Sequence, residues 1–227
     1  MNKIIINTGL WSAITCLMSF IIWIISFTGI SISSPLFFWT NLDDYIQYVK
    51  VNPQFFQYLA KSFMIVFALG YLVLSFVFYE FANVQRQFLA KIALTFSVMF
   101  ALLATTHYFL QVSAVRFAIN EGQVSGLEHF LQAKPTSAIS SLNMLGWTLF
   151  LGLSSFFMHR ALSPGATTRA IRAGLLINTV SCLLAGVGYL LQIDVITFLF
   201  INLFMGGGFL IMTVSSVLYF GRLKKTE

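Results

Sequence analysis

Polar side chains that could bind a ligand gather near the end of one long apolar stretch. His107, Tyr108 and Gln111 follow one another at helical spacing, and Arg116 comes shortly after them. Because residues three and four positions apart share one face of a helix, both His107 and Tyr108 would lie beside Gln111. Such a face could bind a polar ligand or haem iron, or relay a proton through the imidazole. It could equally serve packing, with His107 hydrogen-bonded to a neighbouring helix.

Four amide side chains lie in or beside other apolar stretches. Amides placed in hydrocarbon seek hydrogen-bond partners on other helices. Together with the residues around His107 they could line one polar cavity, or they could form separate contacts between helices. The predicted ligand-binding residues are His107, Tyr108, Gln111, Arg116, Asn143, Asn178, Gln192 and Asn202. The sequence leaves open whether these side chains converge.

The sequence lacks the motifs of common catalytic centres. It contains no HExxH, no Cys-x-x-Cys pair, no Walker A lysine loop and no G-x-S-x-G. Cys16 and Cys182 lie in different apolar stretches, where a thiol typically serves as a small packing residue rather than a metal ligand. We therefore predict no catalytic residue, no metal site and no cofactor. A protein that is not an enzyme is favoured.

The stretches that hold these residues are apolar enough to lie in a membrane. Hydrophobic residues make up 58% of the 227 residues and charged residues only 9%, whereas soluble domains have about 25% charged residues. A helix crosses a bilayer with about 20 mostly apolar residues. Six runs qualify, at residues 10–30, 62–81, 90–112, 137–158, 171–191 and 195–220. We predict an all-α, polytopic protein with six transmembrane helices, in a single domain over residues 1–227.

The basic residues predict the direction in which these helices cross. With the N-terminus in the cytoplasm, nine of the thirteen Lys and Arg residues fall in cytoplasmic segments, as the positive-inside rule requires. An even number of crossings then returns the C-terminus to the cytoplasm. The net charge of +6 is divided among several short segments. Contact with anionic membrane lipids is therefore favoured, and a nucleic-acid partner is not.

Two connections resemble each other and indicate a duplicated hairpin. Residues 42–47 (LDDYIQ) and 127–132 (LEHFLQ) share the order leucine, acidic, any, aromatic, branched aliphatic, glutamine, and a proline follows each of them, at Pro53 and Pro135. Matches between the second and fourth spans, and between the third and fifth, have nearly the same separation. A parallel repeat, related by an axis along the membrane normal, would produce this pattern. Chance matching in a sequence rich in Leu and Phe is the alternative.

The two connections that contain these motifs, residues 31–61 and 113–136, are the long ones. In the predicted orientation both lie on the outer side of the membrane. The first mixes many aromatic residues with few charges, a composition typical of the headgroup layer. We expect short amphipathic helices there, lying on the outer surface and capping the bundle. The link at residues 192–194 is so short that the fifth and sixth helices must be adjacent and antiparallel.

A set of short motifs resembles a group of bacterial membrane proteins. The motifs are Tyr108-Phe109-Leu110-Gln111-Val112 through Arg116, then Pro135, then Leu145-Gly146-Trp147. They are similar to a pattern in uncharacterised bacterial six-helix integral membrane proteins of the domain-of-unknown-function type. That pattern has an acidic residue near the position of Asn143. The resemblance implies a location in the bacterial inner membrane and no particular activity.

Three functions are compatible with these features. The favoured one is a bundle that binds or transports a small molecule or lipid at a polar site open to the outer face. The second is a non-catalytic structural or partner subunit of a membrane complex, whose polar residues serve helix association only. The third is a membrane enzyme or haem protein that uses His107.

Overall fold

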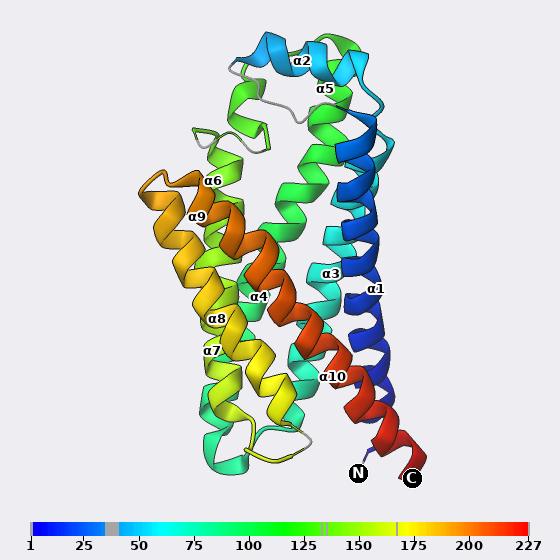
Figure 1. Ribbon diagram of the computed structural model, residues 1–227, viewed down its shortest axis with the longest axis vertical. Helices are drawn as coiled ribbons and strands as arrows, with labels where there is room; N and C mark the ends of the chain where they lie inside the picture. The colour runs from blue at the N-terminus through cyan, green and yellow to red at the C-terminus, as the bar shows by residue number, and fades with distance from the viewer. Residues whose placement is uncertain (1, 35–40, 133, 135, 167, 227) are drawn as a thin grey trace.

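The computed structural model describes residues 2–34, 41–132, 134, 136–166 and 168–226, which are helical along most of their length (Figure 1). Within these residues, six helical stretches are long and apolar enough to cross a membrane: Lys3–Ser33, Phe55–Glu80, Val84–Glu121, Ala138–Ala161, Arg169–Leu190 and Asp194–Thr226. Each predicted span lies within one of them or passes its end by a single residue. The prediction of an all-α protein with six helices able to span a membrane is confirmed.

Three of these stretches are single α-helices, and three contain a π-helical segment. The single helices are α1 (Lys3–Ser33), α3 (Phe55–Glu80) and α8 (Arg169–Leu190). The composite stretches are η1 (Val84–Arg86), α4 (Gln87–Leu110), η2 (Gln111–Val115) and α5 (Arg116–Glu121); α6 (Ala138–Leu145), η4 (Gly146–Phe150) and α7 (Leu151–Ala161); and α9 (Asp194–Phe198), η5 (Leu199–Phe204) and α10 (Met205–Thr226). The π-helical segments are η2, η4 and η5. Such segments are rare and recur at functional sites.

The six stretches form a closed ring in which each packs on its neighbours along the chain. α1 packs on α3, α3 on α4, α4 on α7, α7 on α8 and α8 on α10, and α10 returns to α1. Successive stretches run in opposite directions (Figure 1). Large buried side chains fill the ring, among them Phe67, Tyr71, Phe100 and Phe209.

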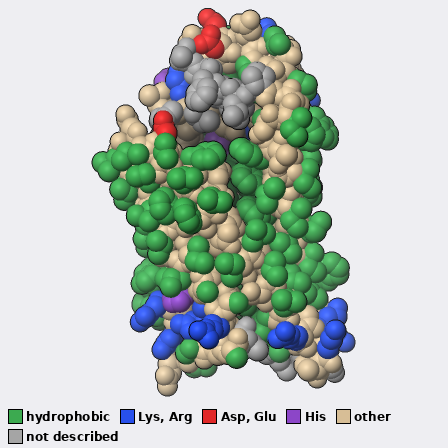
Figure 2. Space-filling model, in the orientation of Figure 1, with side chains coloured by type: hydrophobic (Ala, Val, Ile, Leu, Met, Phe, Trp, Pro, Cys, Tyr) green, Lys and Arg blue, Asp and Glu red, His purple; other side chains and the backbone are tan. Residues whose placement is uncertain are grey.

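One end of the ring, here called the termini end, carries both chain ends (Figure 1). Two connections are joined there. The backbone N–H of Asn83 donates to the carbonyl of Ala161 at 3.1 Å, and the Arg86 guanidinium donates to the carbonyl of Arg160 at 3.2 Å. Figure 2 shows most of the visible Lys and Arg side chains at this end and the acidic side chains at the other.

The opposite end, here called the cap end, is covered by α2 (Leu42–Val51), α5 and η3 (Leu127–Phe130). Helix α2 begins after Asn41, whose side chain accepts a hydrogen bond from the backbone N–H of Asp44 at 2.9 Å, the usual N-cap geometry. A second, small core joins α2 to the α5–η3 segment; it contains Tyr45, Val115, Ile119, Leu127 and Leu131. Burial there raises the pKa of Tyr45 above its ordinary value, because the phenolate would lose its hydration, and Tyr58 and Tyr48 act in the same direction. The matched motifs at 42–47 and 127–132 thus both lie at the cap; Pro135 and the aromatic residues among 35–40 lie outside the described residues.

Glycines permit the closest contacts between helices. A Cβ on Gly174 of α8 would lie 2.6 Å from the carbonyl oxygen of Gly208 and 2.7 Å from the backbone nitrogen of Met212, so no side chain fits there. Small residues allow helices in a membrane to approach in this way. On the other side of α10, the ring of Phe220 covers Gly9 of α1. Above this contact α10 leans away from α1, so that the two helices diverge toward the cap end (Figure 1).

Candidate ligand-binding site

A cavity of about 120 Å³ lies between α1, α3, α4, α6 and the η5–α10 stretch. Its polar lining residues are Tyr108, Asn143, Trp147 and Asn202. Phe20 and Trp23 of α1, Phe67 of α3 and Phe209 of α10 supply further aromatic surface. Aromatic side chains therefore come from five different elements to surround one small space.

A close approach of η4 to α4 brings the polar residues together. A Cβ on Gly146 would lie 3.2 Å from the Cβ of Leu103, so a glycine lets these two segments pack tightly. Trp147 follows directly and is fixed by its ring contacts, edge-on to Phe100 with centroids 4.9 Å apart and stacked on Phe67 at 6.1 Å. Asn143 lies one helical turn before Trp147 and shares its face.

Two polar atoms in this lining lack a hydrogen-bond partner. They are Oδ1 of Asn143 and Nε1 of Trp147, both enclosed. The Tyr108 hydroxyl is close enough to both side chains to act on them as a weak hydrogen-bonding neighbour, but neither Oδ1 of Asn143 nor Nε1 of Trp147 reaches full hydrogen-bond geometry with any described atom. Trp147 is only 7% exposed. An enclosed polar atom left unpaired costs about 1–3 kcal/mol, so this lining is complementary to a partner that supplies both an acceptor and a donor.

Beside the cavity, α1 and α10 are in contact. Phe20 covers Gly206 of α10, where a Cβ would lie 3.0 Å from the Phe20 ring. Beyond this contact α1 and α10 separate, and Figure 2 shows a crevice on this face of the molecule. Asn202 donates from Nδ2 to the carbonyl of Phe198 at 2.9 Å, within its own helical stretch. Residues of both α1 and the η5–α10 stretch line this side of the cavity.

Toward the termini end, an aromatic layer and a hydroxyl cluster follow the cavity. Tyr71 packs edge-on against Phe100 and Phe209, with centroids 5.7 Å and 5.9 Å away. The Tyr71 hydroxyl lies 3.1 Å from Oγ of Ser154, and Ser154 lies 2.7 Å from Oγ of Ser97. In contrast to the cavity lining, these buried hydroxyls satisfy one another.

A larger groove of about 810 Å³ lies between α6 and α8. It is mostly apolar, with Leu145, Leu183, Val187 and Leu190 among its lining residues. These four side chains are exposed, as expected of a surface that meets lipid chains. Met144 lines both this groove and the cavity.

Three of the eight predicted site residues meet in the cavity, namely Tyr108, Asn143 and Asn202. His107 and Gln111 instead join α4 to other segments. Nδ1 of His107 lies 3.3 Å from the carbonyl oxygen of Ile139. Gln111 donates from Nε2 to the carbonyl of Phe130 at 2.6 Å and accepts at Oε1 from the N–H of Gln132 at 3.3 Å.

The other three predicted residues lie apart from the cavity lining. The Arg116 guanidinium carbon lies 5.1 Å from the centre of the Tyr58 ring, at the cap end. Asn178 is buried against Gly208, and both of its side-chain polar atoms lack partners. Gln192 is exposed in the turn between α8 and α9, with a φ of 57°.

The residues predicted for the site do not include Trp147 or Trp23, which both line the cavity. The available signal was the spacing of Trp147, one helical turn after Asn143, which places both on one face of a helix. The sequence predicts that Lys61 lies in the connection at residues 31–61, whereas α3 begins at Phe55 and already includes it.

Among the described residues, no group of three or more His, Cys, Asp or Glu side chains could hold a metal ion. Cys16 and Cys182 are both free and buried. Comparison with protein-family models, with curated proteins and with solved structures finds no match to this chain. The functional argument therefore depends on the cavity itself.

Proposed function

We propose that this chain binds a small, neutral, lipid-soluble molecule in the cavity, through a hydroxyl or amide group attached to a ring-sized apolar body. The observation that carries the proposal is the pair of unpartnered atoms, Asn143 Oδ1 and Trp147 Nε1, on one wall. A ligand hydroxyl can accept a hydrogen bond from the indole N–H and donate one to the amide oxygen. The Tyr108 hydroxyl, next to both side chains, can complete the set.

The size and lining of the cavity support a small, uncharged ligand. An engineered apolar cavity of about 150 Å³ in another protein binds benzene, and the volume here is about 120 Å³. None of the described residues that line the cavity is acidic or basic. A formal charge would therefore lose its hydration without gaining a counter-charge. The aromatic side chains offer a ring-shaped ligand stacked and edge-on contacts.

The proposal includes an orientation in the bacterial inner membrane, with both termini in the cytoplasm. The concentration of Lys and Arg side chains at the termini end (Figure 2) supports it through the positive-inside rule. The cavity would then lie in the outer half of the bilayer and open laterally between α1 and α10. A parallel repeat of two hairpins is part of the same proposal, supported by the common position of residues 42–47 and 127–132 at the cap.

Binding is proposed in preference to transport or catalysis. The aromatic layer of Tyr71, Phe100 and Phe209, with the paired hydroxyls of Tyr71 and Ser154, lies between the cavity and the termini end. His107, on which the enzyme or haem alternative depends, does not line the cavity.

The test compares two probes that differ by one hydroxyl, 4-bromophenol and 4-bromotoluene, with the protein in lipid nanodiscs. Bromine quenches tryptophan fluorescence, and Trp147 and Trp23 line the cavity. We expect 4-bromophenol to reach half-maximal quenching at a concentration at least tenfold lower than 4-bromotoluene does. This corresponds to about 1.4 kcal/mol, within the range of a paired buried hydrogen bond.

The decisive variant is Asn143→Leu, with Asn120→Leu on the exposed surface of α5 as the matched control. Asn143→Leu should bind both probes equally, and Asn120→Leu should behave as the wild type does. Equal binding of both probes by the wild type would refute the proposal and would favour the structural-subunit alternative. A preference that survives in Asn143→Leu would refute the assigned wall.

A further inference from the structure

A buried lysine lies near the cap end, one helical turn from the cavity. Lys61 of α3 is 6% exposed, and its Nζ lies 5.7 Å from the centre of the Tyr58 ring. It is also close enough to His107 to act on it electrostatically. Neither neighbour carries a negative charge. Gln57, one turn earlier on the same face, is buried as well.

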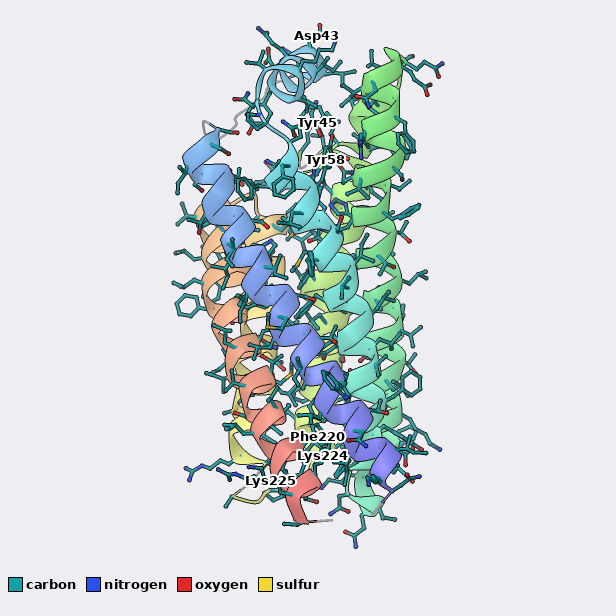
Figure 3. The ribbon with its side chains drawn as sticks, turned by 90° about the vertical axis from the view of Figure 1, so that its right-hand side faces the viewer. Asp43, Tyr45, Tyr58, Phe220, Lys224 and Lys225 are labelled. Carbon is teal, nitrogen blue, oxygen red and sulfur yellow. The ribbon has the colours of Figure 1, made fainter. Side chains whose placement is uncertain are left out.

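A second cation lies against the same aromatic ring. The guanidinium carbon of Arg116 is 5.1 Å from the centre of the Tyr58 ring, and Arg116 itself is exposed. Figure 3 shows Tyr58 below Tyr45 at the cap end. Lys61 comes from α3 and Arg116 from α5, so the fold brings two positive charges from distant parts of the chain to one tyrosine.

The described residues provide no counter-charge for this pair. In the part of the chain that the structure describes, burial is what acts on Lys61, and no nearby carboxylate offsets it. The acidic side chain of Asp43 in α2 is exposed to solvent. A buried cation without a partner is strongly unfavourable, and a cation–π contact offsets only part of that cost. The arrangement is therefore complementary to an anion from outside the chain.

We propose that Lys61 and Arg116 form a binding site for a phosphate-type oxyanion at the cap end. Lys61 lies six residues into α3, about 9 Å along the helix, and the exposed Arg116 contacts the same tyrosine ring. This arrangement suits a group that enters from the headgroup layer. A phospholipid headgroup and a free phosphate ion share this chemistry. The site goes beyond the proposed cavity ligand, which is neutral and depends on other residues.

The test measures the preference for anionic lipid by native mass spectrometry. The protein is offered mixtures of phosphatidylglycerol and phosphatidylcholine with identical chains. We expect the wild type to retain phosphatidylglycerol at least tenfold in preference. Lys61→Gln should lose this preference, whereas Lys50→Gln, which removes an exposed lysine of α2, should stay within twofold of the wild type. Competition by inorganic phosphate would identify a free ion as an equivalent ligand, and its failure to compete would identify the lipid headgroup; both support the site.

A second variant keeps the test decisive if Lys61→Gln does not fold. Arg116→Gln changes an exposed side chain and should weaken the preference at least threefold. The proposal is overturned if the wild type shows no preference, or if Lys61→Gln or Arg116→Gln retains it in full. Asn143→Leu should keep the lipid preference while it loses the 4-bromophenol preference, so the two proposals can fail separately.

Discussion

Two asparagines with enclosed, unpartnered atoms lie in very different surroundings. Asn178 of α8 is enclosed against Gly208 at the crossing of α8 and α10, where the two backbones leave no room for another group. Asn143 of α6 also has an unpartnered oxygen, but it faces a cavity of about 120 Å³. The comparison shows that an unpaired polar atom does not by itself define a site. It does so only where there is space for the missing partner.

The glycines at the α8–α10 crossing and those beside the cavity also have different roles. At the crossing, Gly174 and Gly208 bring two backbones into contact. In the cavity region, Gly146 brings η4 close to α4 and so positions Trp147 beside Tyr108. The first arrangement stabilises the bundle, whereas the second prepares a binding wall at some expense of stability. Variants in the two regions should therefore separate stability from binding.

The largest expected effect is on folding, from Gly174→Ala. The added methyl would meet the backbone at Gly208 and Met212, which cannot move away as a flexible side chain could. We expect a loss of about 3 kcal/mol, seen as a lower unfolding temperature and less monodisperse protein in detergent. The matched control is Gly207→Ala, because a Cβ there meets nothing within 4 Å. Equal stability of the two variants would contradict the close crossing.

The next effect is on binding, from the two asparagines. Asn143→Leu should abolish the preference for 4-bromophenol, whereas Asn178→Ala should leave it within twofold of the wild type, because Asn178 does not line the cavity. Without ligand, Asn143→Leu should also raise the unfolding temperature by a few degrees, since it removes an unpaired buried acceptor worth about 1 kcal/mol. A large loss of binding in Asn178→Ala would mean that the two regions are coupled.

The smallest effect is expected from Ser154→Ala. This change removes the hydroxyl that lies 3.1 Å from the Tyr71 hydroxyl and 2.7 Å from Oγ of Ser97. Hydrogen bonds between membrane helices contribute about 0.6 kcal/mol on average, so thermal unfolding should shift by only a few degrees. Quenching by 4-bromophenol should be unchanged, because Ser154 lies beyond the aromatic layer; a tenfold loss would place the hydroxyl cluster in the binding site.

The helices could be predicted because hydropathy is a local property of the chain. A segment in lipid must satisfy its own backbone, so a continuous apolar run is sufficient to predict a helix. The beginning of α3 was harder to predict. Its first turns include Gln57 and Lys61, which hydropathy assigns to the connection. Both side chains are nevertheless buried, because α3 packs against other helices of the bundle.

The site could be predicted only in part. Tyr108, Asn143 and Asn202 are conspicuous because polar groups in apolar runs are rare, but His107 and Gln111 are equally conspicuous and hold segments together instead. The choice depends on how the helices rotate against one another. Two of the π-helical segments, η4 and η5, contribute cavity residues, and no local pattern in the sequence indicated them. They depend on packing, as does the close approach at Gly146.

The central claim is tested most directly by an experimental structure with 4-bromophenol, in which the anomalous signal of bromine locates the probe. We predict a bromine peak in the cavity beside Trp147, with the phenol hydroxyl within hydrogen-bond distance of Asn143 Oδ1 and Trp147 Nε1. A bromine peak found only in the lipid-facing groove between α6 and α8, among Leu183, Val187 and Leu190, would contradict it.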